Sequence, residues 1–136
     1  MGMYTEINLG LCFKKDTPDE IINTIWCLLG EKEWEKELPN HKFFKCDRFK
    51  MVLTCDSYYF DSITDSKMEF DEIDNKYHLN VRSNLKNYND EIGEFIDYIS
   101  PYIETDGFIG YMRYEECDNP TLIYCNSGKV ECKYIE

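Results

Sequence analysis

The sequence predicts an α+β fold, a two-layer sandwich in which two helices cover one face of a single, mainly antiparallel sheet. Three observations support this prediction. Residues 4–14 alternate between apolar and polar side chains, as a half-buried strand does. Two later segments carry apolar stripes at helical spacing, and the C-terminal segment divides into short apolar runs separated by turn residues. The expected order is β-α-β-β-β-α-β-β-β, in one domain spanning residues 1–136.

The first strand is expected to direct alternate side chains toward the core, namely Thr5, Ile7, Leu9, Leu11 and Phe13. A helix follows, because Thr17 can cap it, Pro18 suits its first turn and Glu20 completes a capping box. Its apolar stripe extends over residues 21–29, and Gly30 is expected to end it.

The middle of the chain is expected to be a loop or short helix that holds Trp34 on the core, over residues 31–47. Alternation over residues 48–55 predicts a strand with Phe49, Met51, Leu53 and Cys55 facing inward. Residues 66–73 and 76–85 are expected to form a hairpin that turns at Asp74 and Asn75. Its inward side chains would be Met68, Phe70, Tyr77, Leu79 and Val81.

The second helix is expected to begin near residues 87–89, and Pro101 is expected to end or bend it near Ser100. Its buried stripe would consist of Ile92, Phe95, Ile96, Ile99 and Ile103. Three short strands, over residues 107–115, 121–125 and 130–135, would complete the sheet.

The chain is strongly acidic, with 27 acids, 15 bases and a formal net charge of −12 over 136 residues. Such a chain repels phosphate, so direct binding to nucleic acid or to an anionic membrane is not expected. A basic protein partner, a cation or plain solubility fits this charge.

The protein is expected in the cytoplasm, because the N-terminus lacks the basic and apolar regions of a signal peptide and no run is long enough to span a membrane. Seven cysteines, an odd number without any CxxC spacing, favour reduced thiols over a disulfide framework.

No motif indicates catalysis. The two histidines, His41 and His78, have no second metal ligand at short spacing, and neither a nucleophile elbow nor a phosphate-binding loop is present. We therefore expect neither an enzyme nor a metal or other cofactor.

The acids are concentrated between residues 87 and 118, where Arg113 is the only base. We expect this acidic lobe, together with exposed tyrosines that follow Asp56, to bind a basic partner. The candidate partner-binding residues are Asp90, Glu91, Glu94, Asp97, Glu115, Glu116, Tyr58 and Tyr59.

The sheet face opposite the helices is the alternative site. It would present a mixture of polar and aromatic side chains that suits a small-molecule or enzymatic site, with His78, Asn80, Arg82, Tyr111 and Arg113 as candidates. The same face could instead meet a second copy of the chain, so the protein would be a monomer or a homodimer.

Residues 83–88, 110–116 and 120–124 (SNLKNY, GYMRYEE and PTLIY) resemble segments of short uncharacterised proteins of low-GC Gram-positive bacteria and their phages. In size, acidity and α+β pattern the chain is also similar to immunity proteins of polymorphic toxins and to phage anti-defence inhibitors. This resemblance implies a non-catalytic inhibitor that neutralises or modulates a basic toxin, nuclease or defence component.

Overall fold

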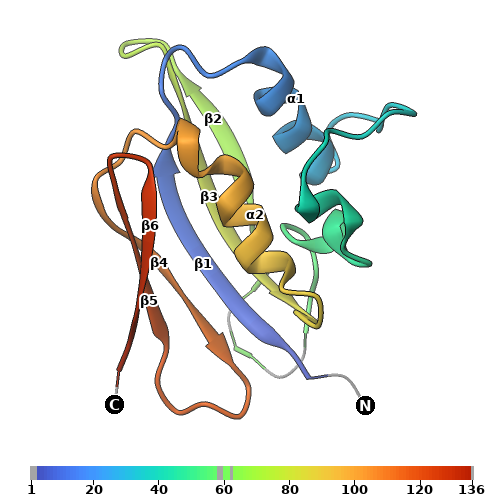
Figure 1. Ribbon diagram of the computed structural model, residues 1–136, viewed down its shortest axis with the longest axis vertical. Coiled ribbons are helices and arrows are strands. Elements are labelled where there is room, and N and C mark those ends of the chain that lie inside the picture. Colours follow the sequence, from blue (N-terminus) through green and yellow to red (C-terminus); the bar gives the residue numbers. More distant parts are fainter. Residues whose placement is uncertain (1–2, 58–59, 62, 136) are drawn as a thin grey trace.

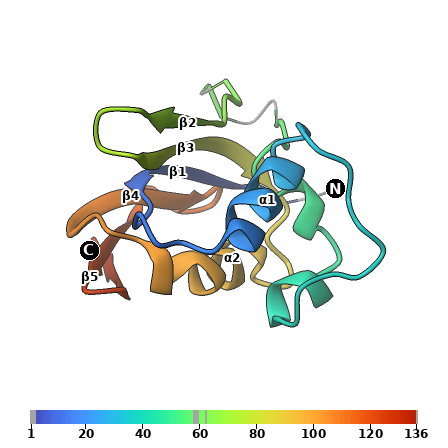
Figure 2. The same cartoon turned by 90° about the horizontal axis from the view of Figure 1, so that it is seen from above.

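The computed structural model describes residues 3–57, 60–61 and 63–135, which form one antiparallel sheet with two α-helices on one face (Figure 1). The strands are β1 (Thr5–Cys12), β2 (Lys67–Asp71), β3 (Lys76–Leu85), β4 (Gly107–Tyr114), β5 (Thr121–Asn126) and β6 (Lys129–Tyr134). The helices are α1 (Asp19–Leu28) and α2 (Glu91–Ile99), with short 3-10 helices η1 (Lys42–Lys45), η2 (Phe49–Met51) and η3 (Ser100–Tyr102). The sheet order is β2-β3-β1-β4-β5-β6, and Figure 2 shows both α-helices below it. The predicted α+β sandwich is confirmed.

The alternating apolar side chains of β1 are buried in the core, as predicted. Ile7, Leu9 and Leu11 are buried on the helix side, and Phe13 continues this face beyond the strand. Because β1 pairs with both β3 and β4, its register also determines which of their side chains face the helices.

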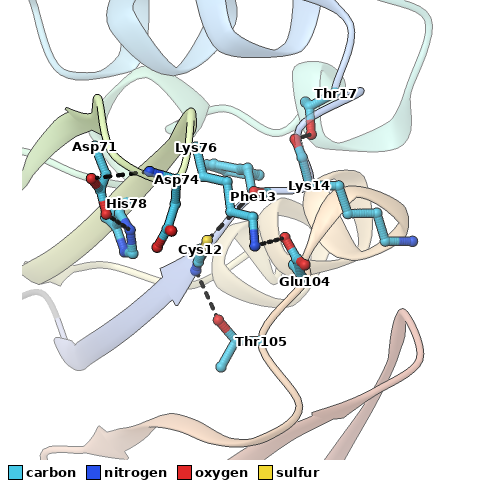
Figure 3. Close-up of polar contacts among 10 residues, drawn as sticks. All are labelled: Cys12, Phe13, Lys14, Thr17, Asp71, Asp74, Lys76, His78, Glu104 and Thr105. Atoms are coloured by element: carbon cyan, nitrogen blue, oxygen red, sulfur yellow. Dashed lines mark hydrogen bonds and ion pairs between the residues drawn. The ribbon is translucent and has the colours of Figure 1, made fainter.

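The first helix ends as expected and begins differently. The N–H of Gly30 donates to the Cys27 carbonyl and the N–H of Glu31 donates to the Trp26 carbonyl, which are the two hydrogen bonds of a Schellman motif. Gly30 has the positive φ of 82° that this motif needs. Thr17 does not cap the helix. Its hydroxyl donates to the Lys14 carbonyl at 2.7 Å instead, and Pro18 is the residue before the helix (Figure 3).

The strand predicted for residues 48–55 is wrong, so the described chain has six strands. Residues 42–45 and 49–51 form 3-10 turns instead. Phe43, Phe44 and Phe49 pack edge to face with one another, and Trp34 stands 5.4 Å from the Phe49 ring. This aromatic cluster buries the segment against the core without strand pairing, and Met51, expected inward, is 50% exposed.

The hairpin of β2 and β3 and the second helix agree with the prediction. Asp90 caps α2 by accepting from the N–H of Gly93, and all five side chains of its predicted stripe are buried. Pro101 lies in η3, directly after the helix. Phe70 packs 4.9 Å from the Tyr77 ring but is 46% exposed, because it lies at the sheet edge.

The bulge of β4 depends on a glycine. Ladder pairing between β4 and β5 shifts between Phe108 and Gly110, and a methyl group on Gly110 would overlap the carbonyl oxygen of Asn8 in β1. Gly10, in contrast, has only an ordinary contact, 3.5 Å to the Asn80 side chain.

We therefore expect Gly110→Ala to lower the free energy of unfolding by about 3 kcal/mol or more, because the β1–β4 pairing must separate to admit the methyl group. Gly10→Ala, in the neighbouring strand β1 where the added methyl group meets only an ordinary contact, is the control and should change it by less than about 1 kcal/mol. Chemical denaturation measures both, and equal effects would contradict the close approach at Gly110.

Candidate functional site: a pocket beneath a surface loop

The described part of the loop between η2 and β2, residues 55–57, 60–61 and 63–66, lies on the sheet face opposite the helices (Figure 2). Both of its ends are attached to β3. The Cys55 carbonyl accepts from the N–H of Asn84 at 2.9 Å and from the hydroxyl of Ser83 at 3.3 Å. Near the other end, Asp65 N–H donates to the Arg82 carbonyl at 2.9 Å. The two ends of this covering loop are therefore bonded to neighbouring residues of β3.

Between its attachments the covering loop reaches across to β4. The Arg113 guanidinium lies 4.9 Å from the centre of the Phe60 ring, and its Nη2 is 3.6 Å from Glu6 Oε1. Glu6, which the pattern places on an exposed face, is only 5% exposed, and Asn84 beside it is 1% exposed. The sheet face opposite the helices is therefore covered at this end and open at the other.

A pocket of about 610 Å³ lies at the margin of the covering loop. Four carboxylates and one guanidinium line it, together with aromatic, thiol and proline side chains. The lining residues are Glu6, Phe60, Asp61, Tyr111, Arg113, Glu115, Cys117, Asp118 and Pro120. With the Arg113 charge held by Glu6, the remaining carboxylates give the pocket a negative potential.

Two of these groups are influenced by their neighbours. Burial, and then the nearby Glu6 carboxylate, raises the pKa of Tyr111, so its phenol is protonated at neutral pH. Glu115 accepts a hydrogen bond from Tyr4 N–H at 2.5 Å, which fixes its carboxylate at the rim. The pocket thus presents an oriented hydroxyl beside fixed negative charge.

The candidate partner-binding residues do not form one surface. Glu91 is wholly buried, contrary to its assignment as a surface acid, and its carboxylate accepts from the N–H groups of Arg48 and Asn89. Asp90 is exposed but caps α2, and Glu94 is half-buried. Glu116 is exposed, whereas Tyr58 and Tyr59 lie outside the described residues.

Asp97 is paired within the chain. Its carboxylate is 2.9 Å from Nε2 of His41, whose Nδ1 accepts from Phe43 N–H at 3.0 Å. Lys42 and Lys45 line the same depression as Glu94 and Asp97, so the basic segment of the chain lies against the acidic face of α2. The negative charge of α2 is therefore partly balanced by basic side chains of the same protein.

The candidate residues of the alternative open-face site do not lie together either. Tyr111 and Arg113 line the pocket, but His78 lies toward the other end of the face, with its Nε2 3.7 Å from Asp71 (Figure 3). Asn80 and Arg82 are exposed along β3 between these two places.

The seven cysteines are free thiols, and Cys117 at the pocket is exposed. Burial raises the pKa of Cys12, Cys27, Cys46, Cys55, Cys125 and Cys132. Among the described residues, no three histidine, cysteine or carboxylate side chains come together as a metal site. Nor does a helix in this part of the chain combine the length and hydropathy needed to cross a membrane.

No family model, curated protein or solved structure matches this chain. Its function is therefore inferred from its own residues.

Sequence reasoning missed Glu6, Phe60, Asp61 and Asp118 as members of one site. Their sequence positions span most of the chain, and they meet because β1 pairs with β4 and the covering loop crosses to Arg113. The available signal was the aromatic run flanked by Asp56 and Asp61, in which three successive rings cannot all face inward from a strand.

We expect Glu91→Ala to lower the free energy of unfolding by about 2–4 kcal/mol, because it empties a buried position and leaves two part-buried backbone N–H groups without their acceptor. Glu116→Ala removes an exposed carboxylate and should change it by less than about 0.5 kcal/mol. Thermal or chemical denaturation of both variants provides the measurement. A Glu91→Ala variant as stable as the parent would contradict the structural role of the Glu91 carboxylate.

Proposed function

We propose that the protein is a non-catalytic binding module whose pocket at the margin of the covering loop receives a lysine or arginine side chain of a basic protein partner. The observation that carries this proposal is the convergence of Glu6, Asp61, Glu115 and Asp118 on one pocket that also contains a tyrosine and a phenylalanine. Carboxylates bind a cationic group, and aromatic walls accommodate the aliphatic part of a long basic side chain.

The charge of the whole chain supports the same class of partner. A net charge of −12 attracts a basic protein from a distance and raises its association rate. We propose that this partner is a toxin, nuclease or defence component that the protein neutralises or modulates in the cytoplasm.

A small organic cation such as a polyamine is the second candidate ligand. The volume of about 610 Å³ favours it, since ligand pockets commonly enclose between about 300 and 1,000 Å³. The two candidates differ in the extent of contact, because a peptide also touches the rim and the exposed strand residues beside it.

The test uses a short oligolysine peptide and spermidine as probes in a titration followed by NMR. We expect the peptide to shift the amide signals of Glu6, Tyr111 and Arg113, and to bind more tightly than spermidine. Reversing two rim charges, Asp61→Lys with Asp118→Lys, should weaken peptide binding by about tenfold and reduce its salt dependence.

The matched control reverses two charges on the other side of the sheet, Glu94→Lys with Asp97→Lys in α2. It changes the net charge equally and should leave the affinity within about threefold, since only long-range attraction is altered. Equal losses in the two double variants would mean that binding follows overall charge, and the pocket proposal would then be wrong. Tighter binding of spermidine would favour the second candidate.

A further inference from the structure

β6 is the last strand in the sheet order, and no further strand of the described part of the chain pairs with its outer edge (Figure 1). The strand follows β5 through a two-residue turn in which Ser127 and Gly128 have φ of 51° and 80°. In such a hairpin the residues that flank the turn exchange both hydrogen bonds, so Lys129, Glu131 and Lys133 bond toward β5. The backbone groups of Val130, Cys132 and Tyr134 therefore point to the free edge.

The side chains of β6 divide by face. Val130, Cys132 and Tyr134 pair with helix-side residues of β5, yet Cys132 is exposed and Tyr134 is 78% exposed. Lys129, Glu131 and Lys133 lie on the opposite face and are all exposed. This edge thus carries two lysines and one glutamate in a chain of net charge −12.

We propose that two copies of the chain pair along β6, antiparallel and with Cys132 on the two-fold axis. Side chains opposite each other in a pleated sheet must lie on the same face, so a symmetric pairing must be centred on one residue of the strand. A pairing centred on Glu131 or on Lys133 sets like charges against each other. Centred on Cys132, Glu131 lies opposite the partner's Lys133, and Val130 lies opposite the partner's Tyr134.

The register centred on Cys132 pairs the strand along its whole length. All three residues with outward backbone groups form closely spaced pairs, which supply about six hydrogen bonds. The exposed Tyr134 ring gains an apolar neighbour, and the sheet continues from one copy into the other. The other end of the sheet lacks this complementarity, because a symmetric pairing that spans all of β2 places Glu69 opposite itself.

Charge reversal tests the register. In the full chain, Glu131→Lys sets two lysines against each other at two symmetric places, and Lys133→Glu does the same with glutamates. Each single variant should weaken dimerisation by at least about tenfold, measured by sedimentation equilibrium. The double variant restores opposite charges and should return the dissociation constant to within about threefold of the parent.

Cross-linking with a short bismaleimide tests the axis. The parent and Cys117→Ser should give a covalent dimer, and Cys132→Ser should not, because only Cys132 lies beside its own copy. Circular dichroism establishes that each variant is folded. A chain that remains monomeric up to about 1 mM would overturn the proposal. So would a dimer that ignores the charge reversals or cross-links without Cys132.

Discussion

Burial of one face of β1 against the helix layer is the constraint on which the remaining geometry depends. The strand pairs with β3 on one side and β4 on the other, and its side chains alternate with a period of two. Once Ile7, Leu9 and Leu11 face the helices, Glu6 and Asn8 must face away. The two registers then place Arg113 beside Glu6 and Tyr111 beside Asn8. A slip of one residue would exchange the core with the candidate site.

The covering loop lies over charged side chains on the sheet face opposite the helices. A carboxylate that leaves water needs compensating charge or hydrogen bonds, and Glu6 is compensated by Arg113, which is itself held against the Phe60 ring. Two apolar side chains of similar volume would fill the same space without this electrostatic cost. Retaining ionised groups under a loop is consistent with a role in binding, because fixed charges beside a pocket recognise a charged ligand without reorganising.

Local patterns predicted most of the fold, and contacts between distant residues account for the errors. Alternation, helical stripes, Gly30 and Pro101 each act within a few residues, so the sequence could place β1, both helices and the C-terminal strands. Residues 48–55 alternate too, but the Phe49 ring packs on Trp34 and Phe44, and this clustering prevails over strand pairing. The covering loop depends on bonds from Cys55 and Asp65 to β3, which no periodicity reveals.

The acidic residues that lie close together in the sequence do not form one surface. The run from residue 87 to 118 includes a buried carboxylate that satisfies backbone donors, a helix cap, and partners of His41 and Lys76. These carboxylates contribute to folding, and their charge is partly neutralised. Asp61 and Asp118 form no such pair within the part of the chain that the structure describes, yet they line one pocket with Glu6. Acidic residues that share a pocket, not those that are adjacent in sequence, determine where a basic side chain is attracted.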